Sequence, residues 1–346
     1  LSFILLFSNY DRSFLIILTR ELSMNKKIVL MITMTFISLS ASALETDQYM
    51  TWGVELSDSG GYINKYLNEK ISSALKVIDS ELTCEKAAIE SMDWNGRTTD
   101  MLSAIESDMY HSEEVDRWPP LTKSAKGVIK ESIYRDVSIF KLKVFGVNLK
   151  MNGVYFGVDK LGHFVTVGRD YYKTFRKYRR RGKSIEFSQI KAIKRGLFSE
   201  STYYGYLVSG VFSFADLEAN FQGLEFMRSM CEGDKPLLKK DNEGNWSLSR
   251  KIDITNYVTP KWDESFYTST YRKKRFRQVR PHLAKYCEKR SEPSVIKRFT
   301  SYYLRDKDNL NSTYLDNLVS KKKLKVPAFQ NLSFVCAMIE QGINIK

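Results

Sequence analysis

The chain has 346 residues, 43% hydrophobic and 27% charged, and its 54 Lys and Arg residues against 40 Asp and Glu residues give a net charge of +14. This composition is typical of a folded globular protein and argues against an intrinsically disordered chain. The positive charge favours polyanionic neighbours. The sequence contains no P-loop, dinucleotide fingerprint, nucleophile elbow or paired-histidine metalloprotease helix, which argues against the enzyme classes that these motifs mark.

The first predicted element is a secretory signal peptide at residues 24–43, MNKKIVLMITMTFISLSASA. It has a positive start at Lys26 and Lys27, a short apolar stretch, and a small-residue cleavage site at 41–43. We therefore expect residues 1–23 to be an upstream extension and the mature chain to begin at Leu44, in the bacterial periplasm or outside the cell. Because residues 1–43 contain four basic and two acidic residues, the mature charge would be +12. A retained anchor is the alternative, although a membrane span needs roughly 20 apolar residues.

The cysteines support an oxidising compartment. All four follow the predicted cleavage site, at Cys84, Cys231, Cys287 and Cys336. Their even number predicts two disulfides, with three pairings open, and no two of them form the C-x-x-C pair of zinc clusters. No later segment is long and apolar enough to span a bilayer. We therefore expect a soluble mature chain without a transmembrane segment.

Apolar residues at three-and-four spacing predict helices along most of the mature chain. The first two helical regions are expected at 58–78 and 82–107, with an interruption near 94–96. Between 144 and 157, two β-rich runs flank Asn152-Gly153, which is the strongest short signal of a hairpin. Further helices are predicted at 159–178, 185–198, 203–208 and 215–230.

After Cys231 the composition becomes polar, which predicts a loop with one short hairpin and marks a candidate domain boundary. The remainder mixes extended segments with helices rich in Tyr, Lys and Arg. The predicted fold is therefore mainly α, a helical soluble domain with a small β-hairpin. Residues 44–235 form its helical core domain, and residues 236–346 form a basic C-terminal region that is either a separate domain or part of the same one.

The helix predicted at 215–230 carries polar residues on its apolar side. At 100° per residue, Asp216 and Asn220 lie within the apolar arc, whereas Glu218, Gln222 and Glu225 lie on the opposite side. A carboxylate and an amide in an apolar surface are costly unless they are paired. We therefore expect them to contact a cation, a metal or a ligand. In the alternative interpretation, Asp216 only caps the first turn and Asn220 bonds a nearby loop.

The segment GVDKLGHF, residues 157–164, supplies a second pair. Asp159 and His163 are four residues apart and share one helix face, where a carboxylate can orient an imidazole or both can bind one metal ion. The alternative is a capping Asp159 beside a half-exposed His163 on a polar stripe. Together with Asp216 and Asn220, this pair predicts a metal-assisted or acid/base hydrolase, with a divalent metal as the candidate cofactor of the first alternative.

The segment also resembles a D-K-x-G-H-F motif of uncharacterised exported bacterial proteins and, more distantly, the D-K-x-x-H signature of VanZ-like membrane proteins. Residues 211–226 and 257–264 resemble further blocks of the exported family. This family brings no established reaction. The resemblance implies that five residues belong to one assembly: Asp159, Lys160, His163, Asp216 and Asn220.

A basic cluster supplies a different functional hypothesis. Its cations are Arg272, Lys273, Lys274, Arg275 and Arg277. They could hold the phosphates of an anionic lipid, a lipopolysaccharide or a wall polymer, and the alternative is an ordinary solvated helix face. Nucleic acid is scarce outside the cytoplasm, so we do not expect it as a partner. The sequence thus predicts an exported, envelope-associated protein that binds an anionic envelope component, with the hydrolase as the alternative.

Overall fold

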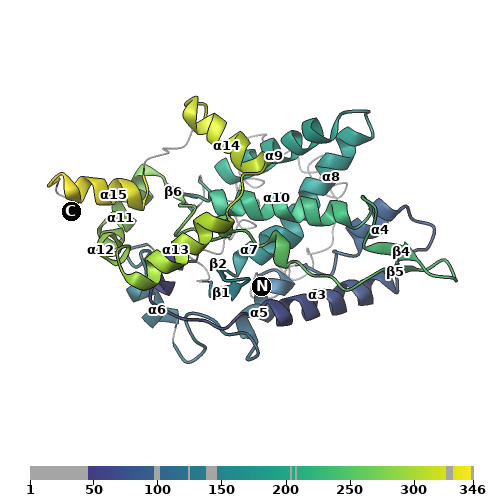
Figure 1. The fold of residues 1–346 in the computed structure, drawn as a ribbon, viewed down its shortest axis with the longest axis horizontal. Helices are drawn as coiled ribbons and strands as arrows, with labels where there is room; N and C mark the ends of the chain where they lie inside the picture. Colours follow the sequence, from purple (N-terminus) through teal and green to yellow (C-terminus); the bar gives the residue numbers. More distant parts are fainter. Residues whose placement is uncertain are drawn as a thin grey trace, which may run out of the picture. The chain divides into compact units, whose positions relative to one another are not determined.

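Helices dominate the fold (Figure 1), and the strands of the described residues form three two-stranded antiparallel sheets. The prediction of a mainly α-helical protein with a small β-hairpin is confirmed. The computed structural model describes residues 46–96, 102–123, 125–137, 146–202, 205–206, 209–324 and 330–343. The predicted upstream extension and signal peptide lie outside these residues, as does most of the short helix predicted at 203–208. None of the described helices is both long and apolar enough to cross a membrane.

The first described element is a 3₁₀ turn at Gln48–Thr51. Four helices follow: α3 (Gly60–Leu75), α4 (Cys84–Glu90), α5 (Ala104–His111) and α6 (Ala125–Glu131). The helix predicted at 58–78 is therefore α3. The region predicted at 82–107 is divided between α4 and α5, and α4 ends close to the expected interruption. Helix α5 starts with a capping box, in which the backbone N–H of Ser103 donates to Glu106 Oε2 at 2.7 Å.

The predicted hairpin is formed by β1 (Asn148–Met151) and β2 (Val154–Gly157), which pair in antiparallel register. Its turn residues, Asn152 and Gly153, have positive φ angles of 53° and 70°. Asn and Gly tolerate this left-handed backbone better than other residues, so this dipeptide sets the position of the turn. The first two residues of the predicted hairpin region, 144 and 145, lie outside the described residues.

The helix predicted at 159–178 is real but irregular. It consists of α7 (Asp159–Gly162), a π-helical segment (His163–Val167) and α8 (Gly168–Arg179). Helices α9 (Ile185–Ser201) and α10 (Phe214–Ser229) follow, close to their predicted bounds. Ser184 and Ser213 cap them, each accepting a hydrogen bond from a backbone N–H three residues on. π-Helical segments are rare and frequently occur at functional sites.

Two glycines allow this irregular helix to pack tightly against α10. A Cβ atom on Gly223 would lie 2.1 Å from the carbonyl oxygen of Phe164, and one on Gly168 would lie 2.6 Å from the Cα atom of Gly223. Both distances are too short for any side chain. The close crossing therefore requires glycine, and it brings the first turns of α7 and α10 together.

The remaining elements are short strands and turns followed by helices. They are β3 (Val211–Phe212), β4 (Leu238–Lys240), β5 (Trp246–Leu248), 3₁₀ turns at Thr255–Tyr257 and Pro260–Trp262, β6 (Thr270–Tyr271), α11 (Lys273–Leu283), α12 (Lys285–Lys289), α13 (Pro293–Arg305), α14 (Leu310–Ser320) and α15 (Leu332–Glu340). Strands β4 and β5 form the hairpin expected after Cys231, and β3 pairs with β6. Between β5 and β6, the 3₁₀ turn at Pro260–Trp262 contacts both β2 and α10.

The largest apolar core joins both parts of the chain. It contains Ile63 of α3, Phe164, and Phe226 of α10, but also Trp262 and Tyr302 from the C-terminal region. All of these side chains are buried. The C-terminal region, as far as Tyr302, therefore shares a core with the helices that precede it.

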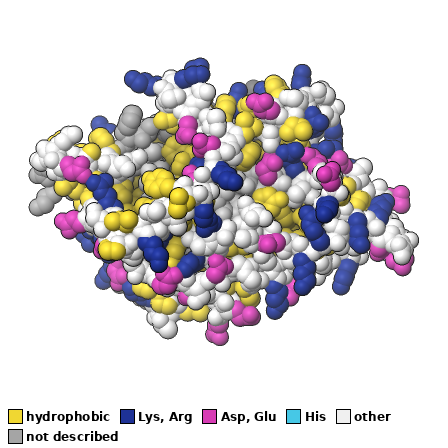
Figure 2. All heavy atoms as spheres, in the orientation of Figure 1, with side chains coloured by type: hydrophobic (Ala, Val, Ile, Leu, Met, Phe, Trp, Pro, Cys, Tyr) yellow, Lys and Arg dark blue, Asp and Glu magenta, His cyan; other side chains and the backbone are white. Residues whose placement is uncertain are grey.

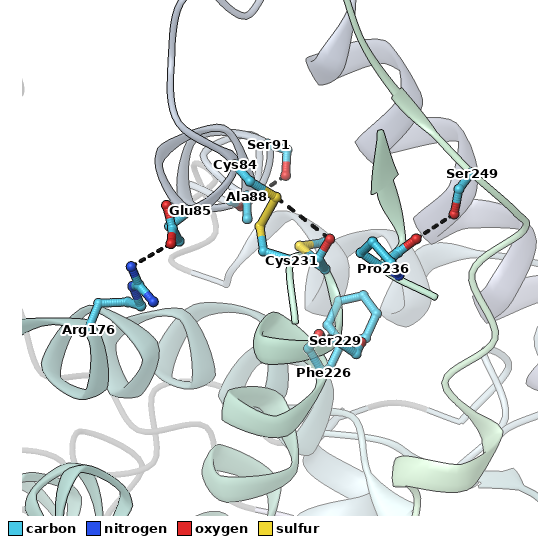
Figure 3. Close-up of a disulfide and its surroundings, with 11 residues drawn as sticks. Cys84, Glu85, Ala88, Ser91, Arg176, Phe226, Ser229, Cys231, Pro236 and Ser249 are labelled. Carbon is cyan, nitrogen blue, oxygen red and sulfur yellow. Dashed lines mark hydrogen bonds and ion pairs between the residues drawn. A yellow bond between two sulfur atoms is a disulfide. The ribbon is translucent and has the colours of Figure 1, made fainter. Parts of the chain in front are cut away.

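Two disulfides join distant elements, as predicted. Cys84 at the start of α4 is bonded to Cys231 just after α10, and Cys287 of α12 is bonded to Cys336 of α15. Figure 3 shows the first bond, with Glu85 and Arg176 paired beside it. This disulfide attaches α4 to the end of the helix that carries Asp216 and Asn220.

Candidate metal centre

A buried ammonium group lies at the centre of the candidate site. Lys160 Nζ lies 2.5 Å from Asp159 Oδ2, 2.6 Å from Asp216 Oδ1 and 2.6 Å from Glu264 Oε1, and its side chain is fully buried. Burial lowers the pKa of this lysine, but the three carboxylates outweigh burial and raise it well above the ordinary value. Lys160 is therefore charged and joins α7, α10 and the C-terminal region.

Glu264 is a site residue that the sequence pattern did not single out. It follows the 3₁₀ turn at Pro260–Trp262 and accepts hydrogen bonds from Ser213 Oγ at 2.9 Å and Ser269 Oγ at 3.1 Å. Its backbone N–H donates to the side chain of Gln48. Because Glu264 lies outside any helix, no periodic pattern indicated which way it points.

His163 uses both ring nitrogens. Nε2 lies 3.2 Å from Asp216 Oδ2, and Nδ1 lies 3.0 Å from Asn220 Oδ1. Because a carboxylate oxygen and an amide oxygen both accept, both nitrogens carry hydrogen and the ring is an imidazolium. Burial opposes this charge, but Asp216 outweighs burial and raises the pKa of His163 to about 10. Burial also opposes the charge of Asp216, yet His163 and Lys160 hold its pKa well below the usual range.

Asp159 does not cap its helix, contrary to the alternative interpretation. The capping position is Val158, and Asp159 is the first residue of α7. Its Oδ2 accepts from Lys160, and its Oδ1 lies 3.4 Å from Thr46 Oγ1. Burial raises the pKa of Asp159 to about 6, although Lys160 lowers it.

The capping interpretation of the α10 pair is also wrong. Ser213 caps α10 by accepting from the backbone N–H of Asp216 at 3.1 Å, which leaves the Asp216 side chain for Lys160 and His163. Asn220 bonds His163 rather than a loop. The four residues predicted to act together are thus brought into one cluster.

One orientation predicted for α10 is incorrect. Glu218 was expected on an exposed polar face but is completely buried. Its carboxylate accepts from Gln222 Nε2 at 2.8 Å, Asn309 Nδ2 at 2.7 Å and Asn311 Nδ2 at 3.1 Å. Helix α14 and the residue before it cover this side of α10 and supply amide donors, so both sides of the helix are buried.

Three residues of the cluster are close enough together to contact a single metal ion. One ligand atom each from Asp159, His163 and Asp216 lie within 4.8 Å of one another, and no other such group occurs in the part of the chain that the structure describes. Around a tetrahedral zinc ion with bonds of about 2.0–2.2 Å, neighbouring ligand atoms are roughly 3.3–3.6 Å apart. A bound ion would therefore hold the three ligand atoms closer together than the 4.8 Å limit within which they lie here. Asn220 holds Nδ1 and so directs Nε2 towards the carboxylates, as outer-shell partners of metal-binding histidines do.

No protein-family model, curated protein or solved structure matches this chain.

Glu106 is a further carboxylate beside the cluster. A Cβ atom on Gly162 would lie 2.1 Å from Glu106 Oε1, so only glycine allows this approach next to His163. Burial, aided by the nearby charge of Asp159, raises the pKa of Glu106 to about 7, although hydrogen bonds from Ser103 lower it. The pattern Ser103-x-x-Glu106 is a capping box that could have indicated this residue from the sequence.

The predicted basic cluster is only partly on the surface. Arg272, Lys273, Lys274 and Arg277 are exposed at the start of α11. Arg275 is buried, and its Nε donates to the backbone carbonyl of Ser209 at 2.7 Å. The structure therefore removes Arg275 from the predicted anion-binding set, because its guanidinium satisfies a buried carbonyl group.

Proposed function

We propose that this protein binds one divalent metal ion through Asp159, His163 and Asp216 and acts as a metal-dependent hydrolase. The observation that carries the proposal is the proximity of three ligand atoms from these residues, within 4.8 Å of one another. Two carboxylates and one imidazole are ligands that zinc and similar ions accept.

The charge of the cluster supports a cation at this position. Three carboxylates surround one ammonium group at Lys160, which leaves a surplus of two negative charges. Protonated His163 offsets half of this surplus. A divalent ion that replaces the proton on His163 would balance it completely, and the raised pKa of His163 reflects the same field.

Partial exposure supports chemistry rather than a purely structural ion. The side chains of His163 and Asp216 are 20% and 14% exposed, whereas Lys160 is fully enclosed. Three protein ligands leave a fourth position, as in catalytic zinc sites. An ion held by these residues would supply Lewis acidity towards water and towards a carbonyl or phosphoryl oxygen. Lys160 would fix the carboxylates of Asp159 and Asp216, and Asn220 would fix the imidazole of His163.

The compartment is part of the proposal. Two disulfides are typical of proteins outside the cytoplasm. Together with the predicted signal peptide, they support a bacterial periplasmic or secreted location. Elemental analysis is meaningful only for protein folded in such a compartment, because reduction would expose four thiols that bind metals themselves.

Elemental analysis of protein purified without chelator from an oxidising compartment tests the metal site. We expect about one divalent ion per chain, lost in Asp216→Asn and His163→Ala. Asp170→Asn and His111→Ala, which change a half-buried carboxylate and an exposed imidazole outside the cluster, serve as matched controls and keep the ion. Wild-type protein that stays metal-free in excess Zn²⁺, Mn²⁺ and Mg²⁺ would refute the proposal.

Hydrolysis is tested separately with the loaded protein. We expect release of p-nitrophenol from phosphate or carboxylate esters that depends on the ion and is absent in Asp216→Asn. An ion that binds at Asp216 without any hydrolysis of either ester class would leave a metal-binding protein and reject the hydrolase.

The exposed basic residues of α11 support a second candidate function, binding of an anionic envelope component such as lipid phosphate, lipopolysaccharide or a wall polymer. The four exposed cations, Arg272, Lys273, Lys274 and Arg277, lie within six consecutive residues. Replacing all four with Gln, with Arg275 retained, should abolish retention on lipopolysaccharide at low salt. Unchanged retention would reject this function.

A further inference from the structure

Helix α13 presents an unusual apolar ridge to solvent. The side chains of Ile296, Tyr303 and Leu304 are 52%, 73% and 83% exposed. At 100° per residue, these three positions fall within an arc of about 100° on one face of the helix. The exposed Thr300 lies within the same arc. Single exposed apolar residues are common, but a group of large ones on one helix face often marks an interaction site. We call these three side chains the α13 ridge.

The opposite face of α13 is firmly attached to the protein. Val295 and Tyr302 are buried, and Arg298 donates to the backbone carbonyl of Thr51 at 2.7 Å. The guanidinium of Arg298 also lies over the ring of Tyr155, 3.6 Å from its centroid. The ridge is therefore a fixed surface of the fold, and contact with a partner requires no unfolding of the helix.

Basic side chains accompany the ridge. Lys297 is exposed on the flank of the helix next to Leu304, and Lys307 is exposed just beyond its end. Arg305 lies further round the helix, where its guanidinium donates to the backbone carbonyl of Asn152 at 2.7 Å. Figure 2 shows hydrophobic and basic side chains close together over the face where Figure 1 places α13. A partner that covers the ridge must therefore accept apolar and positively charged groups at once.

We propose that the α13 ridge docks on the surface of a lipid bilayer that contains anionic headgroups. Apolar side chains beside lysine and arginine match the boundary between acyl chains and negative headgroups. Three side chains of one helix are too small for a stable protein interface, which buries about 800 Å² on each partner. The ridge is separate from the metal ligands and from the α11 cations, so the inference depends on neither proposed function.

Vesicle sedimentation tests the inference. The probes are phosphatidylcholine vesicles with and without about 30% phosphatidylglycerol, mixed with the processed chain recovered from an oxidising compartment. We expect binding to the anionic vesicles that weakens with salt and falls about tenfold or more in Ile296→Ser, Tyr303→Ser, Leu304→Ser. The matched control, Val77→Ser with Ile185→Ser, removes exposed apolar groups from other elements and should bind like the wild type.

Further variants make each result decisive. Lys297→Gln with Lys307→Gln should reduce binding to the anionic vesicles and leave binding to pure phosphatidylcholine unchanged, and Leu304→Ser alone provides a mild ridge variant if the triple variant unfolds. Equal binding by the wild type and the ridge variants would overturn the inference, as would no binding at all. So would loss of binding only when the α11 cations are replaced, or a wild-type dimer that dissociates in the ridge variant.

Discussion

Lys160 and Asp216 form an ion pair of 2.6 Å inside the protein, and the second oxygen of the same carboxylate faces His163 at 3.2 Å. One aspartate thus connects an enclosed ammonium with a partly exposed imidazole. The arrangement explains how the site keeps an excess of negative charge near solvent. It also makes the lysine indispensable, because three carboxylates depend on its charge.

We expect Lys160→Met to destabilise the fold strongly. Removing the ammonium leaves three carboxylates close together without their cation, and breaking a buried ion pair costs about 3–5 kcal/mol. Urea unfolding should show this loss. Lys173→Met is the matched control, because Lys173 pairs with Asp170 at 3.4 Å on the surface and should change the free energy of unfolding by less than about 1 kcal/mol. Equal effects of the two substitutions would contradict the role of Lys160.

The pKa of His163 predicts how stability depends on pH in chelator-treated protein. The folded value of about 10 lies above the ordinary value of 6.5, so the charged ring stabilises the folded state. This contribution is complete below about pH 6.5 and disappears as the pH rises towards about 10. His163→Gln should lack this loss. Thermal unfolding measured at pH values from 6 to 10 checks it, and parallel Tm profiles of the two proteins would disprove the assignment.

Gly162 should tolerate no side chain. A Cβ atom there would lie 2.1 Å from Glu106 Oε1, so Gly162→Ala displaces a buried carboxylate and should cost about 1–3 kcal/mol. Nothing lies within 4 Å of a Cβ atom on Gly61, so Gly61→Ala should be neutral or slightly stabilising. Adding Glu106→Ala to Gly162→Ala should recover part of the loss in denaturant unfolding. No recovery would show that Glu106 is not the residue displaced.

The two disulfides should differ in their contribution to stability. Cys84–Cys231 closes a sequence separation of 147, and Cys287–Cys336 closes one of 49. Removing either by replacement with serine should cost about 2–5 kcal/mol. Removing Cys84–Cys231 should cost about 1 kcal/mol more, because the entropy that a disulfide removes from the unfolded chain grows with the logarithm of the length of the loop it closes. Denaturant unfolding of the two paired variants measures this difference, and the opposite order would contradict the entropic explanation.

Local patterns in the sequence were sufficient for several helices up to α10, for the hairpin and for part of the site, whereas the bounds of α11 to α15 were not predicted. Helical spacing located α3, α9 and α10, and Asn152-Gly153 located the turn between β1 and β2. The same spacing placed Asp216 and Asn220 inside an apolar face, where they indeed meet other polar groups. These features were predictable because each depends on residues within one or two turns of the chain.

Tertiary structure decided which groups complete the site. Glu264 contacts Lys160 across a separation of 104 residues, and no periodicity connects the two. Glu106 reaches the cluster only because Gly162 lacks a side chain, and Glu218 is buried only because α14 covers it. From helical spacing alone, one can predict which way a side chain points from the axis of its own helix, but not which charged groups lie around it. The charge around it was set by how distant segments pack, because electrostatic interactions depend on distances in space rather than along the sequence.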